Sequence, residues 1–137
     1  MVTGGDCYMV MRYKVYDPTV TAVTAVNPYN DPAGLTYASN SSLVYWQGQF
    51  WAAFDGNVGN YREGESGQQI WLTTSTDGVT WTTSVQPFRD STYCTNPYAG
   101  AVSEWQPNLA VVGDELWCTW TTDTEGYVSK RAATGKW

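Results

Sequence analysis

The chain has 137 residues, a length suited to one domain with a modest core. Seven basic residues against 13 acidic ones give a net charge of −6, so we expect no nucleic-acid partner. Disorder is excluded by the 8 Trp, 10 Tyr and 3 Phe. No apolar run approaches the roughly 20 residues of a membrane span, and no secretory signal is visible.

Histidine is absent, which excludes Ser-His-Asp and Cys-His catalysis and the usual imidazole-bearing zinc sites. The three cysteines, Cys7, Cys94 and Cys118, form no C-x-x-C pair, so at most one internal disulfide can form and their redox state stays open. We therefore expect no metal site and no cofactor. Any acid or base chemistry would have to use carboxylates or tyrosines.

Strand patterns dominate the chain, and no window has uninterrupted helical spacing of apolar residues. The runs rich in β-branched and aromatic residues are bounded by turn-forming residues and lie at 8–16, 43–54, 69–75, 109–112, 115–121 and 127–132. Two tight hairpins are predicted, at Gln47-Gly48 and at Gly113-Asp114, because each contains a glycine that can take a positive φ. The chain is therefore predicted to be all-β and antiparallel.

The two hairpins belong to a repeat. LVYWQGQFWAAFDGN, which begins at Leu43, matches LAVVGDELWCTWTTD, which begins at Leu109. Each is followed by a similar second unit, QIWLTTSTDGVTW or YVSKRAATGKW. A recurring unit of about four strands is typical of β-propeller blades. A sandwich or jelly roll would explain the strand content equally well, but it would not predict that these units recur in order.

We predict an incomplete propeller with about two four-stranded blades in this chain, whereas closed rings have 4 to 8. Further copies or a longer parent chain would close the ring. The N-terminal strand could belong to a neighbouring blade or form an independent arm. The predicted parts are an N-terminal strand segment with a loop, a first blade-like repeat with its turn motif, a long loop and a truncated second repeat, at residues 1–34, 35–88, 89–105 and 106–137.

Residues 75–81, STDGVTW, resemble the Asp-box of sialidase-like propellers, with one residue fewer between Asp and Gly. In such a turn the aspartate accepts hydrogen bonds from the turn's own N–H groups, and the tryptophan folds back onto the blade. The resemblance implies a structural motif on the outer rim, away from the binding face. Its positions are Ser75, Asp77, Gly78, Thr80 and Trp81.

The segment NDPAG at 30–34 resembles the N-D-P-N-G segment of five-bladed invertase-like and arabinanase-like glycosidases. Those families also have an R-D-P segment and a later acid, matched here by RDS at 89–91 and by Glu104. The resemblance implies Asp31, Asp90 and Glu104 as catalytic carboxylates, and glycoside hydrolysis requires two. The spacing argues against it, because Asp90 and Glu104 are too close in sequence to come from successive blades. Asp-Pro-Ala-Gly is also an ordinary turn.

Two loops are better candidates for binding, because a rigid sheet presents loop residues to ligands. The loop at 57–67 contributes Tyr61 and Arg62. The segment 88–105 is too long for a plain hairpin connection and contributes Arg89, Tyr93, Asn96, Tyr98 and Trp105. The tryptophans within the predicted strands or the turn motif are expected to pack between blades instead, and these are Trp51, Trp71, Trp81, Trp117 and Trp120.

These features predict a noncatalytic carbohydrate-recognition or adhesion module of an extracellular or virion-surface protein, with a glycan or polysaccharide as its partner. Exposed aromatic rings can stack on sugars while amides and carboxylates bond the hydroxyls. Two alternatives stay open: a glycoside hydrolase that uses paired carboxylates, and a structural virion or surface component. The sequence identifies neither the glycan nor the number of blades.

Overall fold

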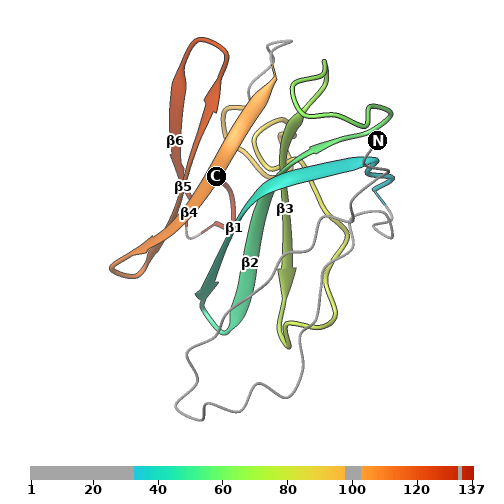
Figure 1. Cartoon of the computed structure of the whole chain (residues 1–137). Helices are drawn as coiled ribbons and strands as arrows, with labels where there is room; N and C mark the ends of the chain where they lie inside the picture. Colours follow the sequence, from blue (N-terminus) through green and yellow to red (C-terminus); the bar gives the residue numbers. More distant parts are fainter. Residues whose placement is uncertain (1–32, 98–102, 133) are drawn as a thin grey trace.

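The computed structural model describes residues 33–97, 103–132 and 134–137, which form two antiparallel three-stranded sheets (Figure 1). The first sheet has the order β1-β2-β3, with strands Tyr37–Trp46, Gln49–Asn57 and Gln69–Ser75. The second has the order β4-β5-β6, with strands Glu104–Val112, Glu115–Thr122 and Gly126–Lys130. The expected all-β fold is confirmed. In these ranges no helix is long and apolar enough to cross a membrane.

Both predicted hairpins are present. Gln47 and Gly48 join β1 to β2 with φ values of 49° and 82°, and positive φ at both central residues suits the right-handed twist of the flanking strands. Gly113, with φ 61°, and Asp114 join β4 to β5. The strand predicted within residues 8–16 lies outside the described residues.

Next to β3, the position of a fourth strand in the first sheet is occupied by only a short paired segment. Beyond β3, Leu72 and Val85 exchange two backbone hydrogen bonds of 2.9 and 3.0 Å, and the Thr82 N–H donates to the Thr74 carbonyl at 2.9 Å. Pro87 follows shortly after Val85 and lacks the N–H that would extend this pairing. Each described sheet therefore has three named strands where the repeat predicts four.

Two strands begin earlier than the sequence indicated. β1 starts at Tyr37 and β4 at Glu104, because each continues past a bulge that the apolar pattern did not reveal. The placement of Glu104 and Trp105 in the long loop is therefore wrong, because they are the first two residues of β4. The connection into β4 is correspondingly shorter, and both side chains are held by strand pairing.

The main core lies between the two sheets. The first sheet contributes one face of β2 and β3, including Trp51, Ala53, Ile70 and Leu72. The second sheet contributes Leu109 from β4 and three alternate residues of β5, which are Leu116, Cys118 and Trp120. Phe88, Cys94 and Trp137 from the connecting segments complete this core.

The pairing of faces distinguishes a propeller from a two-layer sandwich. Trp51 corresponds to Trp117 in the repeat, yet Trp51 faces the core and Trp117 lies half-buried on the opposite face of β5. Phe54 corresponds to Trp120 but packs in a separate cluster with Leu35 and Trp71. Non-equivalent faces therefore meet, as in a rotational array, whereas two-fold packing would join equivalent faces.

Gly56 in β2 has no room for a side chain. A Cβ there would lie 2.6 Å from Cδ1 of Trp71 and 3.0 Å from Cδ2 of Leu35. We expect Gly56→Ala to lower the free energy of unfolding by about 2 kcal/mol, because overpacking displaces a buried indole. Urea denaturation measures this loss. Gly126→Ala is the matched control, since nothing lies within 4 Å of a Cβ at that strand position. Equal losses in the two variants would contradict the steric explanation.

Candidate functional site

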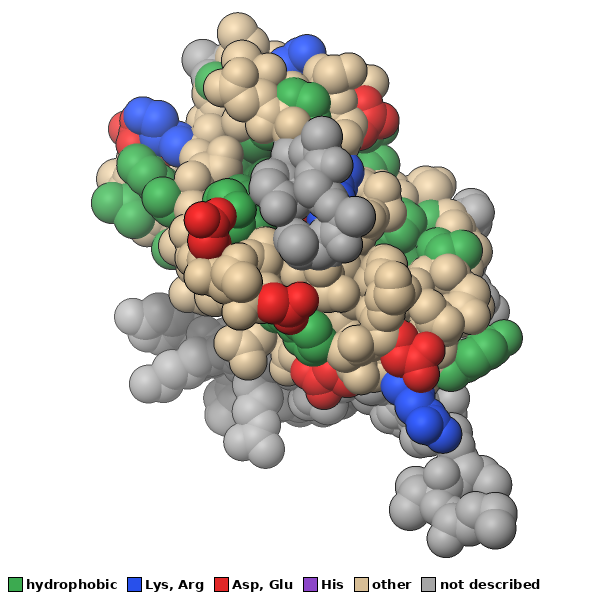
Figure 2. All heavy atoms as spheres, turned by 90° about the horizontal axis from the view of Figure 1, so that it is seen from above, with side chains coloured by type: hydrophobic (Ala, Val, Ile, Leu, Met, Phe, Trp, Pro, Cys, Tyr) green, Lys and Arg blue, Asp and Glu red, His purple; other side chains and the backbone are tan. Residues whose placement is uncertain are grey.

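The upper end of the sheets in Figure 1 gathers the start of β1, the start of β4, the β2–β3 loop and the β5–β6 turn. We call this end the loop face. Figure 2 views the molecule from above and shows acidic side chains spread across it. The acidic residues of these segments include Glu63 and Glu65 in the β2–β3 loop and Asp123 and Glu125 in the β5–β6 turn.

Equivalent bulges interrupt β1 and β4 at the loop face. The β1 register shifts between Ser39 and Ser42, and the β4 register shifts between Trp105 and Asn108, which align with them in the repeat. Asn40 and Gln106 occupy the bulges with φ of 46° and 52°. A positive φ is uncommon for residues other than glycine, and bulges often re-aim side chains beside functional sites. The repeat thus places two unusual backbone conformations on adjacent sheets.

Asp55 of β2 lies between these bulges and is fully buried. Its Oδ2 accepts a hydrogen bond of 2.8 Å from the Asn40 side-chain amide, and the Gln106 backbone also donates to its carboxylate. Its Oδ1 has no hydrogen-bond partner in the described ranges. Burial raises the pKa of Asp55 to about 6, with smaller upward contributions from Glu63 and Glu104. One side chain thereby bonds residues from both sheets.

The same amide of Asn40 reaches the surface. It donates a second hydrogen bond of 2.9 Å to Oε1 of Glu63, a residue of the exposed β2–β3 loop. A chain of contacts therefore runs from the buried Asp55 through Asn40 to an exposed carboxylate. Carboxylate and amide groups at such a surface can accept and donate hydrogen bonds to the hydroxyls of a ligand.

Trp105 is a half-buried aromatic residue of this face. Its indole N–H donates to Oδ1 of Asp123 at 3.2 Å. Its ring packs against Gly64 of the β2–β3 loop, where a Cβ would come within 3.1 Å of the indole. The structure thus brings Trp105 to the loop that carries the exposed Tyr61 and Arg62. These three predicted binding residues share one end of the molecule.

Glu104 and Arg89 form a buried ion pair beneath the loop face. Glu104 Oε1 lies 3.1 Å from Nε of Arg89, and its side chain is 0% exposed. Its Oε2 accepts the Ile70 backbone N–H at 3.0 Å, which joins β4 to β3. Burial raises the pKa of Glu104, against the lowering effects of the Ile70 N–H and Arg89. These contacts explain Glu104 as a structural residue, and they argue against its role as the catalytic acid and against Arg89 as a ligand-binding residue.

The other predicted catalytic carboxylates do not join Glu104. Asp90 is exposed, and its Oδ1 accepts the Thr92 backbone N–H at 2.7 Å. That bond lowers its pKa and is typical of an aspartate that stabilises a turn. Asp31 and the predicted binding residue Tyr98 lie outside the described residues.

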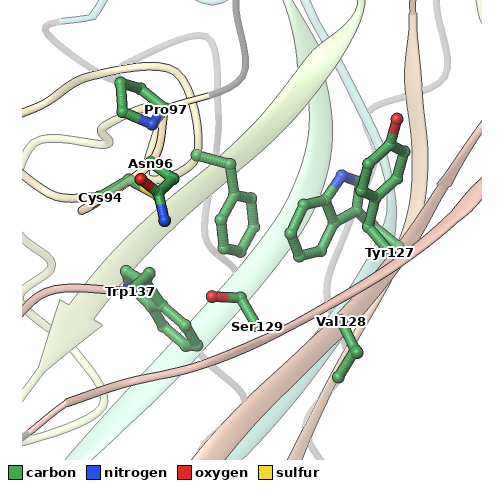
Figure 3. A pocket seen from close by; sticks show the side chains of 9 residues that line it. Cys94, Asn96, Pro97, Tyr127, Val128, Ser129 and Trp137 are labelled. Atoms are coloured by element: carbon green, nitrogen blue, oxygen red, sulfur yellow. The ribbon is translucent and has the colours of Figure 1, made fainter.

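Asn96 borders a separate pocket of about 420 Å³ between β5–β6 and the segment 88–97 (Figure 3). Its aromatic rings are already engaged with one another. Trp120 stacks on Phe88 with ring centroids 3.8 Å apart and on Tyr127 at 5.5 Å, while Trp137 meets Phe88 edge-on at 5.5 Å. Trp120 is buried and already stacks on two rings, so it offers little surface to a sugar.

Tyr93, another predicted binding residue, is half-buried and pairs through its backbone. Its carbonyl accepts the Trp137 N–H at 2.8 Å, and the neighbouring Thr95 N–H donates to the Trp137 carbonyl at 2.9 Å. This pairing ties the C-terminal residue to the long connection. Tyr93 therefore lies away from the residues that meet at the loop face.

The turn after β3 has the hydrogen bonds expected from its sequence. Oδ1 of Asp77 accepts the backbone N–H groups of Val79 and Thr80 at 2.8 and 2.7 Å. Ser75 Oγ donates to the same carboxylate and accepts the Gly78 N–H at 2.9 Å. The Thr80 N–H is the largest cause that lowers the pKa of Asp77 to about 2. Trp81 is half-buried, and its indole N–H has no partner in the described part of the chain.

Sequence reasoning missed three residues of the loop face: Asn40, Asp55 and Gln106. The repeat contained a usable signal for two of them, because Asn40 and Gln106 occupy equivalent positions in it. Nothing local marks Asp55, whose partners come from other strands. Among the residues that the structure describes, no cluster of three or more acidic, Cys or His side chains could hold a metal ion.

Comparison with known proteins identifies the type of fold. A family model described as BT_1020-like, N-terminal beta propeller, matches residues 13–112. A solved structure described as a sialidase superposes with a TM-score of 0.55 at 20% sequence identity, and the match covers 75% of this chain but 12% of that protein. At this identity the likeness concerns the fold alone. No curated protein matches the sequence.

Proposed function

The chain belongs to the BT_1020-like N-terminal β-propeller family, and we propose that its loop face binds a neutral glycan without cleaving it. The proposal rests on the position of Trp105. This half-buried indole lies beside a loop that carries exposed tyrosine, arginine and carboxylate side chains. An aromatic ring flanked by hydrogen-bonding groups suits a sugar, which presents an apolar ring face and hydroxyls at its edge.

The geometry around Trp105 holds the ring in place before a ligand arrives. Asp123 fixes the indole N–H, and Gly64 leaves space for the ring because it has no side chain. A ring that is already oriented loses little conformational entropy on binding. The part of the residue that remains exposed can therefore serve as a platform for a sugar ring.

Charge favours a neutral glycan over an anionic one. Glu63 and Asp123 lie at the platform, and the whole chain has a net charge of −6. A sialylated or otherwise acidic sugar would be repelled by these carboxylates. The similar solved structure is described as a sialidase, and we do not transfer that description to the loop face.

We propose binding rather than hydrolysis because the predicted carboxylates have other roles in the structure. Glu104 is buried in its ion pair with Arg89, and Asp90 stabilises a turn. A glycosidase needs two carboxyl groups that flank the scissile bond, and they must be able to touch the substrate. The Glu104 side chain has no exposed surface with which to do so.

Two further assignments belong to this proposal. The turn at 75–81 is an Asp-box, supported by the bonds that Asp77 accepts from Val79 and Thr80. The half-buried, outward-facing side of β5 at Trp117 is where a further blade would continue the ring. A glycan-binding role suits an extracellular or virion-surface protein, and that location stays a prediction.

Replacing Trp105 tests the proposal. We expect the protein to bind neutral glycans on an array, and Trp105→Ala to weaken that binding about tenfold or more, as for a central aromatic contact. Calorimetric titration with the neutral glycan that binds most tightly on the array measures the change. Lactose and sialyllactose compare a neutral sugar with its sialylated form directly.

Trp117→Ala is the matched control for this experiment. Trp117 is also a half-buried indole of the second sheet whose N–H donates to a carboxylate, Glu115 at 3.2 Å, but it lies at the other end of β5. Its loss should leave glycan affinity unchanged. An array without hits, or equal weakening by both substitutions, would reject the loop face as the binding site.

A further inference from the structure

A second pocket lies at the opposite end of the sheets from the loop face. It has a volume of about 640 Å³ and is formed where the two hairpin turns meet the segment after β6. We call it the hairpin pocket. The residues used below are Trp46, Gln47, Gln49, Trp51, Arg131 and Gly135, all of which line it. Its volume falls within the range of small-molecule sites, roughly 300 to 1,000 Å³.

Arg131 is the central charged group of the hairpin pocket. Its guanidinium carbon lies 4.6 Å from the centre of the Trp51 ring and 5.9 Å from that of Trp137. Its backbone N–H donates to the Leu116 carbonyl at 2.9 Å, which anchors the residue beside β5. The planar group is thus held by aromatic rings, while its edges carry the N–H donors that match a carboxylate.

In the described ranges no carboxylate forms an ion pair with this guanidinium, although Asp114 and Glu115 also line the pocket. Lys130, the neighbouring cation, pairs with Glu115 at 2.7 Å, and Glu115 also accepts the Trp117 indole N–H. Asp114 contributes its backbone carbonyl to the Trp46 indole at 3.0 Å. Burial lowers the pKa of Arg131, because it partly removes the charge from water.

The space in front of Arg131 is kept open by a glycine. A Cβ on Gly135 would lie 3.4 Å from Nη2 of Arg131, so any larger residue would crowd that donor. Trp46 meets Trp51 edge-on with ring centroids 5.7 Å apart, and both indoles border the pocket. Gln47 and Gln49 line the same space, and a glutamine side chain can offer donors and acceptors for hydroxyl groups.

We propose that the hairpin pocket binds an acidic sugar, with Arg131 holding the sugar carboxylate and the Gln47 and Gln49 amides bonding the ring hydroxyls. Indole surface from Trp46 supplies the apolar contact. A guanidinium–carboxylate pair supplies charge-assisted, two-pronged hydrogen bonds that a neutral sugar cannot make. This site is separate from the loop face in position and in the charge of its ligand, and it does not depend on glycan binding there.

Indole N–H signals in ¹⁵N-edited NMR test the proposal on the whole chain. Its eight tryptophans give separate reporters, which single Trp→Phe variants assign. We expect D-glucuronate to shift the Trp46 and Trp51 signals saturably. D-glucose should bind at least about tenfold more weakly than D-glucuronate. Arg131→Gln should weaken glucuronate binding by about tenfold or more. Arg131→Lys keeps the charge but loses the forked geometry, so we expect it to weaken glucuronate binding less than Arg131→Gln does. It is the second variant to measure if Arg131→Gln does not fold.

Controls separate this site from the loop face and from simple charge effects. Lys136→Gln removes one positive charge from the same segment, where Lys136 donates to the Ser91 carbonyl, and should leave glucuronate affinity unchanged. Trp105→Ala should also have no effect. Glucuronate shifts at Trp105 instead of Trp46 and Trp51, or no saturable shift at all, would overturn the proposal. Acetate binding as tightly as glucuronate would overturn the assignment to a sugar.

Discussion

Glu104→Ala is expected to lower the free energy of unfolding by about 3 to 5 kcal/mol, the typical cost of breaking a buried ion pair by removing one partner. The substitution removes the partner of Arg89, whose side chain is only 13% exposed. It also leaves the Ile70 N–H without its acceptor at the junction of β3 and β4. Denaturant unfolding followed by tryptophan fluorescence measures the loss. Glu104→Gln retains an acceptor for Ile70 and should be less damaging.

A paired replacement separates the ion pair from general damage to the core. If the loss in Glu104→Ala arises from the broken ion pair with Arg89, then Arg89→Met combined with Glu104→Leu should recover much of the stability, because an apolar pair of similar size often replaces a buried ion pair at little cost. The exposed pair of Lys130 and Glu115 is the control, and Glu115→Ala should have no measurable effect. A small loss in Glu104→Ala would show that the pair contributes little.

Asp55→Asn is expected to stabilise the protein at pH 7 and to leave it almost unchanged near pH 4. The folded-state pKa of Asp55 is about 6, above its ordinary 3.8, so the folded chain keeps a proton that the unfolded chain releases between these values. Stability therefore falls as the pH rises from about 4 to about 6. The full cost above that range is about 3 kcal/mol, at about 1.4 kcal/mol per pH unit.

Urea denaturation of native protein and Asp55→Asn at both pH values measures this difference. The asparagine keeps an oxygen that can accept the Asn40 amide, so the comparison isolates the charge. Asp114→Asn, which removes a carboxylate from an exposed turn, is the control for the loss of one acidic group. A variant that is less stable than the native protein at pH 7 would mean that the charge of Asp55 is needed by its neighbours.

Asp55 also connects the two equivalent bulges of β1 and β4. Asn40 and Gln106 come from adjacent sheets, and each donates a hydrogen bond to the same carboxylate. The polar contact is buried at the loop face and keeps the starts of β1 and β4 together. Ser42 makes a parallel connection lower on the same strands, because its Oγ accepts the Leu109 N–H at 2.9 Å. These contacts of Asp55 and Ser42 therefore hold β1 and β4 together beneath the loop face that carries Trp105.

Local patterns were sufficient for most of the strands. The β-branched and aromatic residues in 69–75 predicted β3 with its observed ends, and the glycines of the two hairpins located both turns. The internal repeat placed the second sheet after the first and favoured a propeller over other all-β folds. These features depend on patterns that can be read along a single chain, so the sequence reveals them.

Side-chain environments were not available from those patterns. Glu104 resembled a catalytic acid in a loop, yet it begins a strand and pairs with Arg89 and with Ile70, both of which lie well before it in the sequence. Arg89 was expected to bind a ligand for the same reason. Arg131 was not noticed at all, because its position over the Trp51 ring depends on contacts between segments far apart in the sequence.

The amino-acid sequence by itself determined the all-β class, the two hairpins and the order of the repeats, because turn residues and alternating apolar residues act over a few positions along the chain. The tertiary structure alone decided which faces meet, which carboxylates are buried and which aromatic rings stay accessible. Those properties depend on contacts between residues such as Asp55 and Gln106, which lie on different sheets and meet only when the chain has folded. Burial then influences whether a carboxylate keeps its proton and whether an aromatic ring can contact a ligand.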